Sequence, residues 1–84
     1  MNEIFNFHGQ EVRTVIFDNE PWFVAKDVAD ILGYQNGSRD INRHVDEDDK
    51  LTSQVATAGQ MRNQTVINES GLYSLILSSK LPQA

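Results

Sequence analysis

The segment VAKDVADILGYQNGSRDINRHV, residues 24–45, contains two apolar repeats at the spacing of an α-helix. The first repeat consists of Val24, Val28, Ile31 and Leu32, which fall on one helical stripe. Lys26, Asp27 and Asp30 should then face away from that stripe. Gly33 suits the position just past a helix, where the backbone often turns left-handed. We therefore predict a first helix that ends before Gly33 and is followed by a tight turn.

The second half of this segment predicts another short helix. Ser38 is a natural amino-terminal cap, and the helix should run through Val45. Ile41 and Val45 are four residues apart and should face the core. The residues left on the outward face are Arg39, Asn42 and Arg43. Arginine can pair with guanine, and asparagine with adenine, through two hydrogen bonds each. The alternative is that this face is merely the solvated side of an amphipathic helix, which is the commoner role for such residues.

Segments rich in β-branched and aromatic residues flank the two helices. We expect strands over residues 4–7, 11–17, 22–24, 51–55 and 64–67. Turns should lie at residues 8–10 and 18–21, and a polar loop over residues 56–63 should join the last two strands. Trp22 and Phe23 are expected in the core. These strands predict one β-hairpin near the start of the chain and another after the second helix.

A third helix should follow the last strand, with Asn68 or Ser70 as its cap. Its apolar face would contain Leu72, Leu75 and Ile76, with Tyr73 half-buried and a stop near Leu81 and Pro82. The whole chain, residues 1–84, is then one small α+β domain with β-hairpins and about three short helices. Helix, turn, helix and hairpin in this order resemble a winged helix-turn-helix, in which the hairpin contacts the DNA backbone.

The remaining cations suggest contacts to phosphate. Lys26 begins the first helix, His44 and Lys50 lie close to the second, and Arg62 is near the tip of the second hairpin. The chain as a whole carries a formal charge of −5, so an interaction with DNA has to depend on local charge. Residues 46–49, DEDD, would repel phosphate unless they point away from the duplex.

Other classes of site find little support in the sequence. Residues 46–49 lack the central Gly and the distal Glu of an EF-hand loop, so a solvated loop or a contact to a basic protein is favoured over a metal site. No nucleophile motif or phosphate-binding loop is present, and we expect no catalytic residue and no cofactor. Cysteine is absent and no apolar run could span a bilayer, which favours a soluble protein of the cytoplasm.

Four blocks of sequence resemble the Bro-N domain of phage and prophage antirepressors and of baculovirus BRO proteins. The blocks are PWFVAKDVA at residues 21–29, LGY at 32–34, HVDEDDK at 44–50 and INESGLYSLI at 67–76. The resemblance covers nearly the whole chain. It implies a compact α+β domain at the amino terminus of a longer protein, associated with DNA binding and the control of lysogeny in a bacterial host cell.

Two functions therefore remain open at the level of the sequence. In the first, the domain binds double-stranded DNA as part of an antirepressor-like transcription regulator, as a homodimer if its sites are palindromic. In the second, it is an acidic protein-interaction module that inactivates a phage repressor without touching DNA. Neither function is enzymatic.

Overall fold

A computed structural model of the chain describes residues 2–7, 9–57 and 59–79, with the side chains of residues 2–4 and 57 excepted. The predicted turn at residues 8–10 lies partly outside this described part, and the predicted helix stop at Leu81 and Pro82 lies wholly outside it. The elements in chain order are β1 (Asn2–Phe7), β2 (Gln10–Phe17), β3 (Glu20–Val24), α1 (Ala25–Leu32), α2 (Gly37–His44), the short 3-10 helix η1 (Glu47–Asp49), β4 (Lys50–Thr57), β5 (Gln60–Ile67) and α3 (Glu69–Ser78). No helix in the described part is long and apolar enough to cross a membrane.

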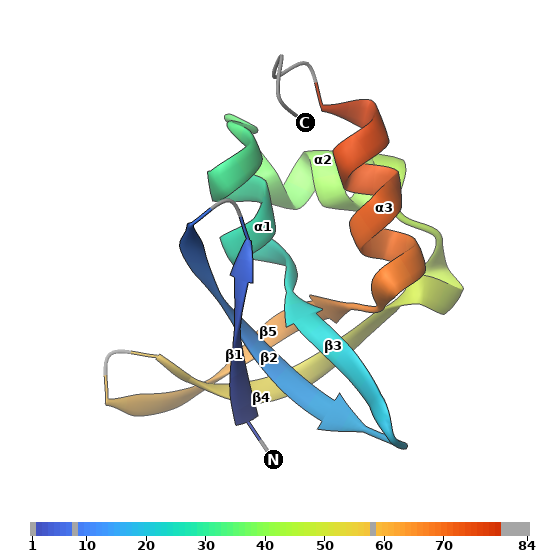
Figure 1. Cartoon of the computed structure of the whole chain (residues 1–84). Helices are drawn as coiled ribbons and strands as arrows, with labels where there is room; N and C mark the ends of the chain where they lie inside the picture. Colours follow the sequence, from blue (N-terminus) through green and yellow to red (C-terminus); the bar gives the residue numbers. More distant parts are fainter. Residues whose placement is uncertain (1, 8, 58, 80–84) are drawn as a thin grey trace.

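The strands form one antiparallel sheet in the order β1-β2-β3-β5-β4 (Figure 1). The strands form two units, the three-stranded meander β1-β2-β3 and the hairpin β4-β5. They are joined at only two residue pairs, Phe23 with Ile67 and Val24 with Val66. Asp18 and Asn19 both have positive φ in the turn between β2 and β3, as a tight hairpin turn requires. The α+β class, the three helices and both predicted hairpins are confirmed.

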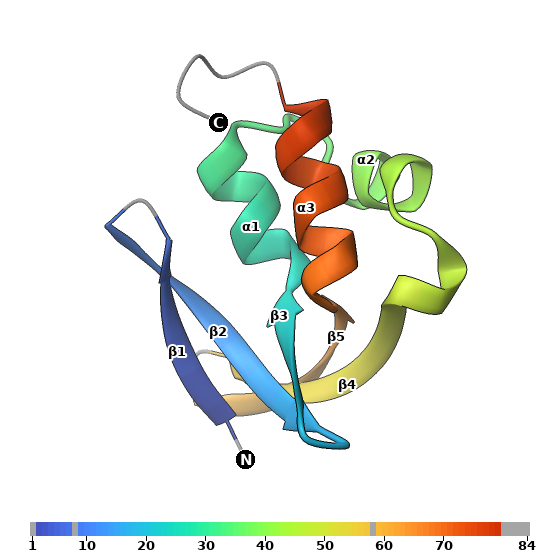
Figure 2. The ribbon, with the colours of Figure 1, turned by 45° about the vertical axis from the view of Figure 1, so that its right-hand side comes forward.

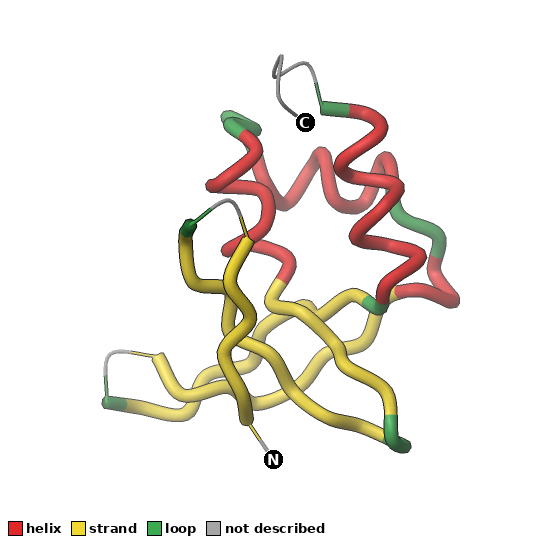
Figure 3. Tube along the Cα trace, in the orientation of Figure 1, coloured by secondary structure: helices red, strands yellow, loops and turns green. Residues whose placement is uncertain are grey.

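The three helices gather at one end of the molecule, and the strands occupy the other (Figure 3). Turning the molecule by 45° shows α1 and α3 side by side, with α2 next to α3 (Figure 2). The larger core lies between these helices and the sheet and includes Phe23, Val28, Ile41, Ile67 and Leu75. A smaller cluster on the sheet consists of Trp22, Val24, Val55 and Val66, with Val15 packed against it. Burial of these apolar surfaces is the main source of stability in a domain without disulfides.

The helices begin and end at residues that satisfy or redirect the backbone, namely capping asparagines and a left-handed glycine. Gly33 has φ of 84° at the end of α1, as the sequence predicts. The amino end of α2 differs from the prediction, because the Asn36 side chain, and not that of Ser38, accepts a hydrogen bond from the Arg39 backbone N–H at 3.1 Å. Asn68 caps α3 by accepting from the Gly71 N–H at 2.9 Å. Of the two caps considered for α3, Asn68 is therefore the one used.

Gly71 lies where α3 packs against β5 and the segment after α2. A Cβ atom at this position would be 3.0 Å from Ile67 Cβ, 3.0 Å from Val45 Cγ1 and 3.4 Å from the Asp49 carbonyl oxygen. Glycine therefore permits α3, β5 and the segment after α2 to pack against one another. The contact fixes how α2 is positioned relative to the rest of the domain.

An ion pair between Arg13 on β2 and Asp27 on α1 joins the sheet to the helices. One Asp27 carboxylate oxygen accepts from Arg13 Nε at 2.9 Å and from the Arg13 backbone N–H at 3.1 Å, and the other accepts from Nη2 at 2.8 Å. Arg13 Nη1 also donates to the Ala56 carbonyl on β4 at 3.2 Å. The prediction that Asp27 faces away from the packed side of α1 is wrong, because this residue is half-buried and paired.

Two other predictions need correction. The expected loop over residues 56–63 is largely strand, because the β4–β5 ladder continues from the pair Lys50–Ile67 to the pair Thr57–Gln60. The polar residues of that ladder face solvent and so do not show apolar alternation. Tyr73 was expected half-buried but is 56% exposed. Trp22, Phe23, Leu72 and Leu75 are buried as predicted.

Candidate nucleic-acid interface

Helix α2 is anchored on one face and exposed on the other. Ile41 and Val45 are buried, as predicted, and hold the helix against the core. The three outward residues of the prediction, Arg39, Asn42 and Arg43, are all exposed. They do not, however, form one set, because the two arginines line a different hollow from Asn42.

The two arginines lie on the side of α2 that faces the end of α3. Arg39 and Arg43 line a hollow together with Tyr34, His44 and Ser78. The Arg39 side chain is 66% exposed, and its Nε lies 3.6 Å from a carboxylate oxygen of Asp40. Among the described residues, no carboxylate lies within ion-pair distance of Arg43. Both guanidinium groups are therefore accessible to an anionic partner.

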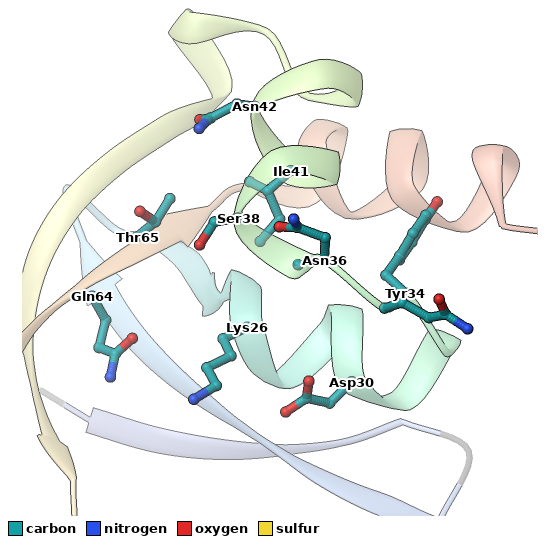
Figure 4. Close-up of a pocket in the computed structure, with 11 residues that line it drawn as sticks. Lys26, Asp30, Tyr34, Asn36, Ser38, Ile41, Asn42, Gln64 and Thr65 are labelled. Carbon is teal, nitrogen blue, oxygen red and sulfur yellow. The ribbon is translucent and has the colours of Figure 1, made fainter.

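The opposite side of α2 faces a polar groove of about 390 Å³ between α1, α2 and β5 (Figure 4). The side chains that line it with hydrogen-bonding groups include Lys26, Asp30, Asn36, Ser38, Asn42, Gln64 and Thr65. An ammonium group, amides and hydroxyls can each donate a hydrogen bond to the acceptors on base edges or to phosphate. This groove brings Lys26 and Asn42, two of the predicted site residues, to one surface.

Lys50 is held by neighbouring side chains. Its Nζ donates to Asn42 Oδ1 at 3.1 Å and lies 3.2 Å from a carboxylate oxygen of Glu47, and its side chain is only 10% exposed. A predicted phosphate contact and a predicted base contact thus touch each other. Because Lys50 donates to the Asn42 carbonyl oxygen, the Asn42 NH₂ group, which is a donor, is not used in this contact.

Arg62 lies on β5, away from the two hollows that α2 lines. It is exposed, and its Nη2 donates to Gln60 Oε1 at 3.2 Å. The hairpin that carries it projects beyond the body of the sheet (Figure 1). The structure therefore places Arg62 on an arm that is separate from the hollows lined by Arg39, Arg43 and Lys26.

The acidic run has a defined location next to α2. Asp46, Glu47 and Asp48 are exposed after the carboxyl end of α2, and Asp49 accepts a hydrogen bond from the Asn68 amide at 3.0 Å. The polar groove extends along α2 from Asn36 to Asn42. Within the described residues, no cluster of His, Cys, Asp and Glu could hold a metal ion.

Two residues of the polar groove had no role in the sequence prediction. Gln64 and Thr65 were assigned only to a strand, and nothing in their local pattern distinguishes them from other polar strand residues. They come to the groove because β5 pairs with β3, which places α1 beside it, and residues of α2 line the same groove. Arg13 was also given no role, and its pairing with Asp27 depends on a contact between residues 14 positions apart.

The fold and the site define a small α+β domain with an exposed polar helix and a projecting hairpin. A model of the BRO family, N-terminal domain, matches residues 11–84, and the chain belongs to this family. The resemblance seen in the sequence is thereby confirmed.

Two curated relatives were found. An uncharacterized protein of Haemophilus influenzae is 35% identical over 81 residues, which cover 95% of this chain and 40% of that protein. The Bro-N domain-containing protein 289L of Invertebrate iridescent virus 6 is 35% identical over 82 residues, which cover 76% of this chain and 20% of that protein. The chain thus spans less than half the length of either relative. No solved structure shows a significant match.

Proposed function

We propose that this domain binds double-stranded DNA, with α2 in the major groove and the β4–β5 hairpin against the backbone, in the manner of a winged helix-turn-helix. The observation that carries the proposal is the exposure of Arg39 and Arg43 on one side of α2, with a groove of amides, hydroxyls and Lys26 on its other side. An α-helix fits the width of the major groove, and these are the side chains that read base edges there.

The two sides of α2 would have different tasks. Arg39 and Arg43 would donate to guanine or to phosphate, because a guanidinium group presents paired N–H donors. Asn42 and Gln64 would contact adenine, with the Asn42 orientation set by Lys50. Lys26 and Arg62 would hold the backbone on either side.

Local charge supports this orientation despite the net charge of −5. Four of the six described cations are exposed, namely Lys26, Arg39, Arg43 and Arg62, and of these Arg39 has a carboxylate, that of Asp40, within ion-pair distance. The other two, Arg13 and Lys50, are less exposed and ion-paired. The acidic run follows the carboxyl end of α2, and one of its carboxylates, that of Glu47, is paired with Lys50. On this proposal the domain acts by binding and not by catalysis. It belongs to an antirepressor-like regulator in the cytoplasm of a host cell and dimerises where its sites are palindromic.

Titration with a duplex of mixed sequence over a series of salt concentrations tests the proposal. We expect affinity to fall steeply with salt, and the Arg39→Ala, Arg43→Ala double variant to lose about two units of the log–log slope and about tenfold in affinity. Fluorescence anisotropy of labelled DNA gives both quantities.

The matched control is the Arg39→Lys, Arg43→Lys double variant, which retains the charge but loses the paired donors. It should bind random duplex nearly as well as the native chain and lose preference for a selected site. Absence of binding at low salt by the native chain, or a slope that neither double variant changes, would contradict the proposal.

The acidic surface favours a second candidate, a module that binds and inactivates a phage repressor without contacting DNA. Asp46, Glu47 and Asp48 are exposed together and would attract a basic partner. Under this alternative, the chain fails to bind DNA at low salt and captures a purified repressor, and an Asp46→Asn, Asp48→Asn variant releases it.

A further inference from the structure

An uncovered apolar groove lies between α3 and the β1-β2-β3 part of the sheet. Its volume is about 460 Å³, and Phe5, Phe7, Ile16, Phe23, Tyr73 and Ile76 are among the side chains that line it. The Phe5 and Phe23 rings pack at 5.4 Å between centroids and form its floor. Helix α3 contacts β3 and β5, helix α1 contacts β2, and the groove lies beside α3, between it and β1, β2 and β3 (Figure 2).

Two aromatic side chains that line this groove are exposed. Phe5 is 42% exposed and Tyr73 56%, although each could bury a large apolar area. Contiguous apolar surface of this kind is commonly an interaction site in soluble proteins.

Among the described residues, the charged side chains at and next to this groove are all acidic. Among the described residues, Glu69 is the one charged side chain that lines it, and Glu20 lies next to Pro21 and Glu69 in the adjoining hollow. No described lysine or arginine lines either hollow. An occupant with a basic flank would therefore gain from the charge at this end, and an acidic occupant would be repelled.

We propose that this groove binds an amphipathic helix of a partner protein, one whose apolar face is flanked by lysine or arginine. The apolar face would cover Phe5, Ile16 and Tyr73, and the basic flank would lie against Glu69. Such a helix would complete the layer that α3 begins, as in other helix-in-groove complexes. The surface is separate from the proposed DNA site, because the groove shares no lining residue with the hollows on either side of α2. The domain could then hold DNA and a protein partner at once.

Two synthetic peptides test this proposal. Each has about 16 residues with leucine at helical spacing, and they differ only in having lysine or glutamate beside the leucine face. We expect the lysine peptide to bind about tenfold more tightly than the glutamate peptide. Amide shifts in ¹⁵N spectra should concentrate at the groove residues Phe5, Ile16, Glu69, Tyr73 and Ile76.

The charge at Glu69 is tested with two variants of equal net charge. Glu69→Lys should weaken the lysine peptide about tenfold and strengthen the glutamate peptide. Asp48→Lys, in the exposed acidic run, should leave the preference between the two peptides unchanged. Tyr73→Ser should weaken both peptides and leave DNA affinity as it was, which separates this proposal from the proposed function.

Three results would overturn the proposal. In the first, the two peptides bind equally or cause no shift in the groove. In the second, Asp48→Lys changes the affinities of the two peptides as strongly as Glu69→Lys does. The lysine peptide would then be attracted by the net charge of the domain and not by Glu69. In the third, raising the concentration of the free domain produces the same shifts without a peptide, in which case the occupant is a second copy of the chain.

Discussion

Replacement of Gly71 by valine should destabilise the domain by about 3 kcal/mol or more, a large part of the roughly 4 to 13 kcal/mol expected for a domain of this size. The first added carbon already lies 3.0 Å from two neighbours, Ile67 Cβ and Val45 Cγ1, where carbon atoms normally stay about 3.5 to 4 Å apart. Ile67 Cβ is attached to β5, and the Val45 methyl belongs to a stiff β-branched side chain, so neither moves without a shift of backbone.

Alanine at the same position separates sterics from helix propensity. It favours the helix by about 1 kcal/mol over glycine, and yet we expect a net loss because the clash at Cβ remains. Ser70→Val, at an exposed position of the same helix turn, is the control and should change the free energy of unfolding by about 0.5 kcal/mol or less. Urea unfolding followed by the fluorescence of Trp22 measures all three. Equal stability of the Gly71→Val and Ser70→Val variants would show that α3 is not packed as described.

Removal of the Asp27 carboxylate should cost about 2 to 3 kcal/mol. Asp27→Ala leaves the Arg13 backbone N–H and two of its guanidinium nitrogens without their acceptor at a half-buried site. The loss is smaller than for a fully buried pair, because water reaches part of both side chains. Asp30→Ala removes an exposed carboxylate from the same helix and should be nearly neutral. A double-mutant cycle with Arg13→Ala would reveal a negligible coupling if the pair contributed nothing.

The same pair makes stability depend on pH. Burial raises the pKa of the Asp27 carboxyl, but hydrogen bonds from the Arg13 side chain and backbone and the charges of Arg13 and Lys26 outweigh it, so the pKa lies below the ordinary value of 3.8. A lowered pKa in the folded state means that this stabilisation is complete above about pH 5 and is lost as the pH falls through the folded-state pKa. The difference in free energy of unfolding between the native chain and Asp27→Asn should therefore shrink below pH 4. A constant difference down to pH 2 would exclude this linkage.

Most of the fold follows from local patterns. The apolar spacing of Val28 and Leu32 and the left-handed Gly33 fix α1 and its end, and Ile41 with Val45 fixes the buried face of α2. Each of these signals depends on residues that are close together in the sequence, because helix periodicity and capping act over short spans of chain. The family resemblance depends on blocks that include these same positions.

Long-range pairing could not be predicted in the same way. The sheet becomes continuous only because Phe23 pairs with Ile67, which are 44 positions apart, and no short pattern encodes this register. The polar groove depends on that pairing, so Gln64 and Thr65 stayed unrecognised as site residues. Asn36 replaced Ser38 as the cap because helix α2 begins two residues earlier than the prediction, a difference that local propensity does not resolve.

The sequence predicted which residues of α2 are exposed, but it did not predict how the side chains of the site contact one another. Exposure of Arg39, Asn42 and Arg43 follows from the helix period, but the contact from Lys50 to Asn42 depends on side-chain conformations across eight positions of chain. Whether these residues contact DNA stays a prediction, and the salt series decides it.

The hydrogen bond from Arg13 to the Ala56 carbonyl gives the β4–β5 arm a second point of support beyond its two-pair junction with β3. If the arm lies along DNA as proposed, Arg13 on β2 helps to set the angle between the arm and the rest of the domain, although Arg13 itself does not contact the duplex. Loosening that support would let the arm follow duplexes of many curvatures. The effect would appear as weaker discrimination between rigid A-tracts and flexible TA-rich sites, with overall affinity preserved, and competition binding with Arg13→Lys measures it.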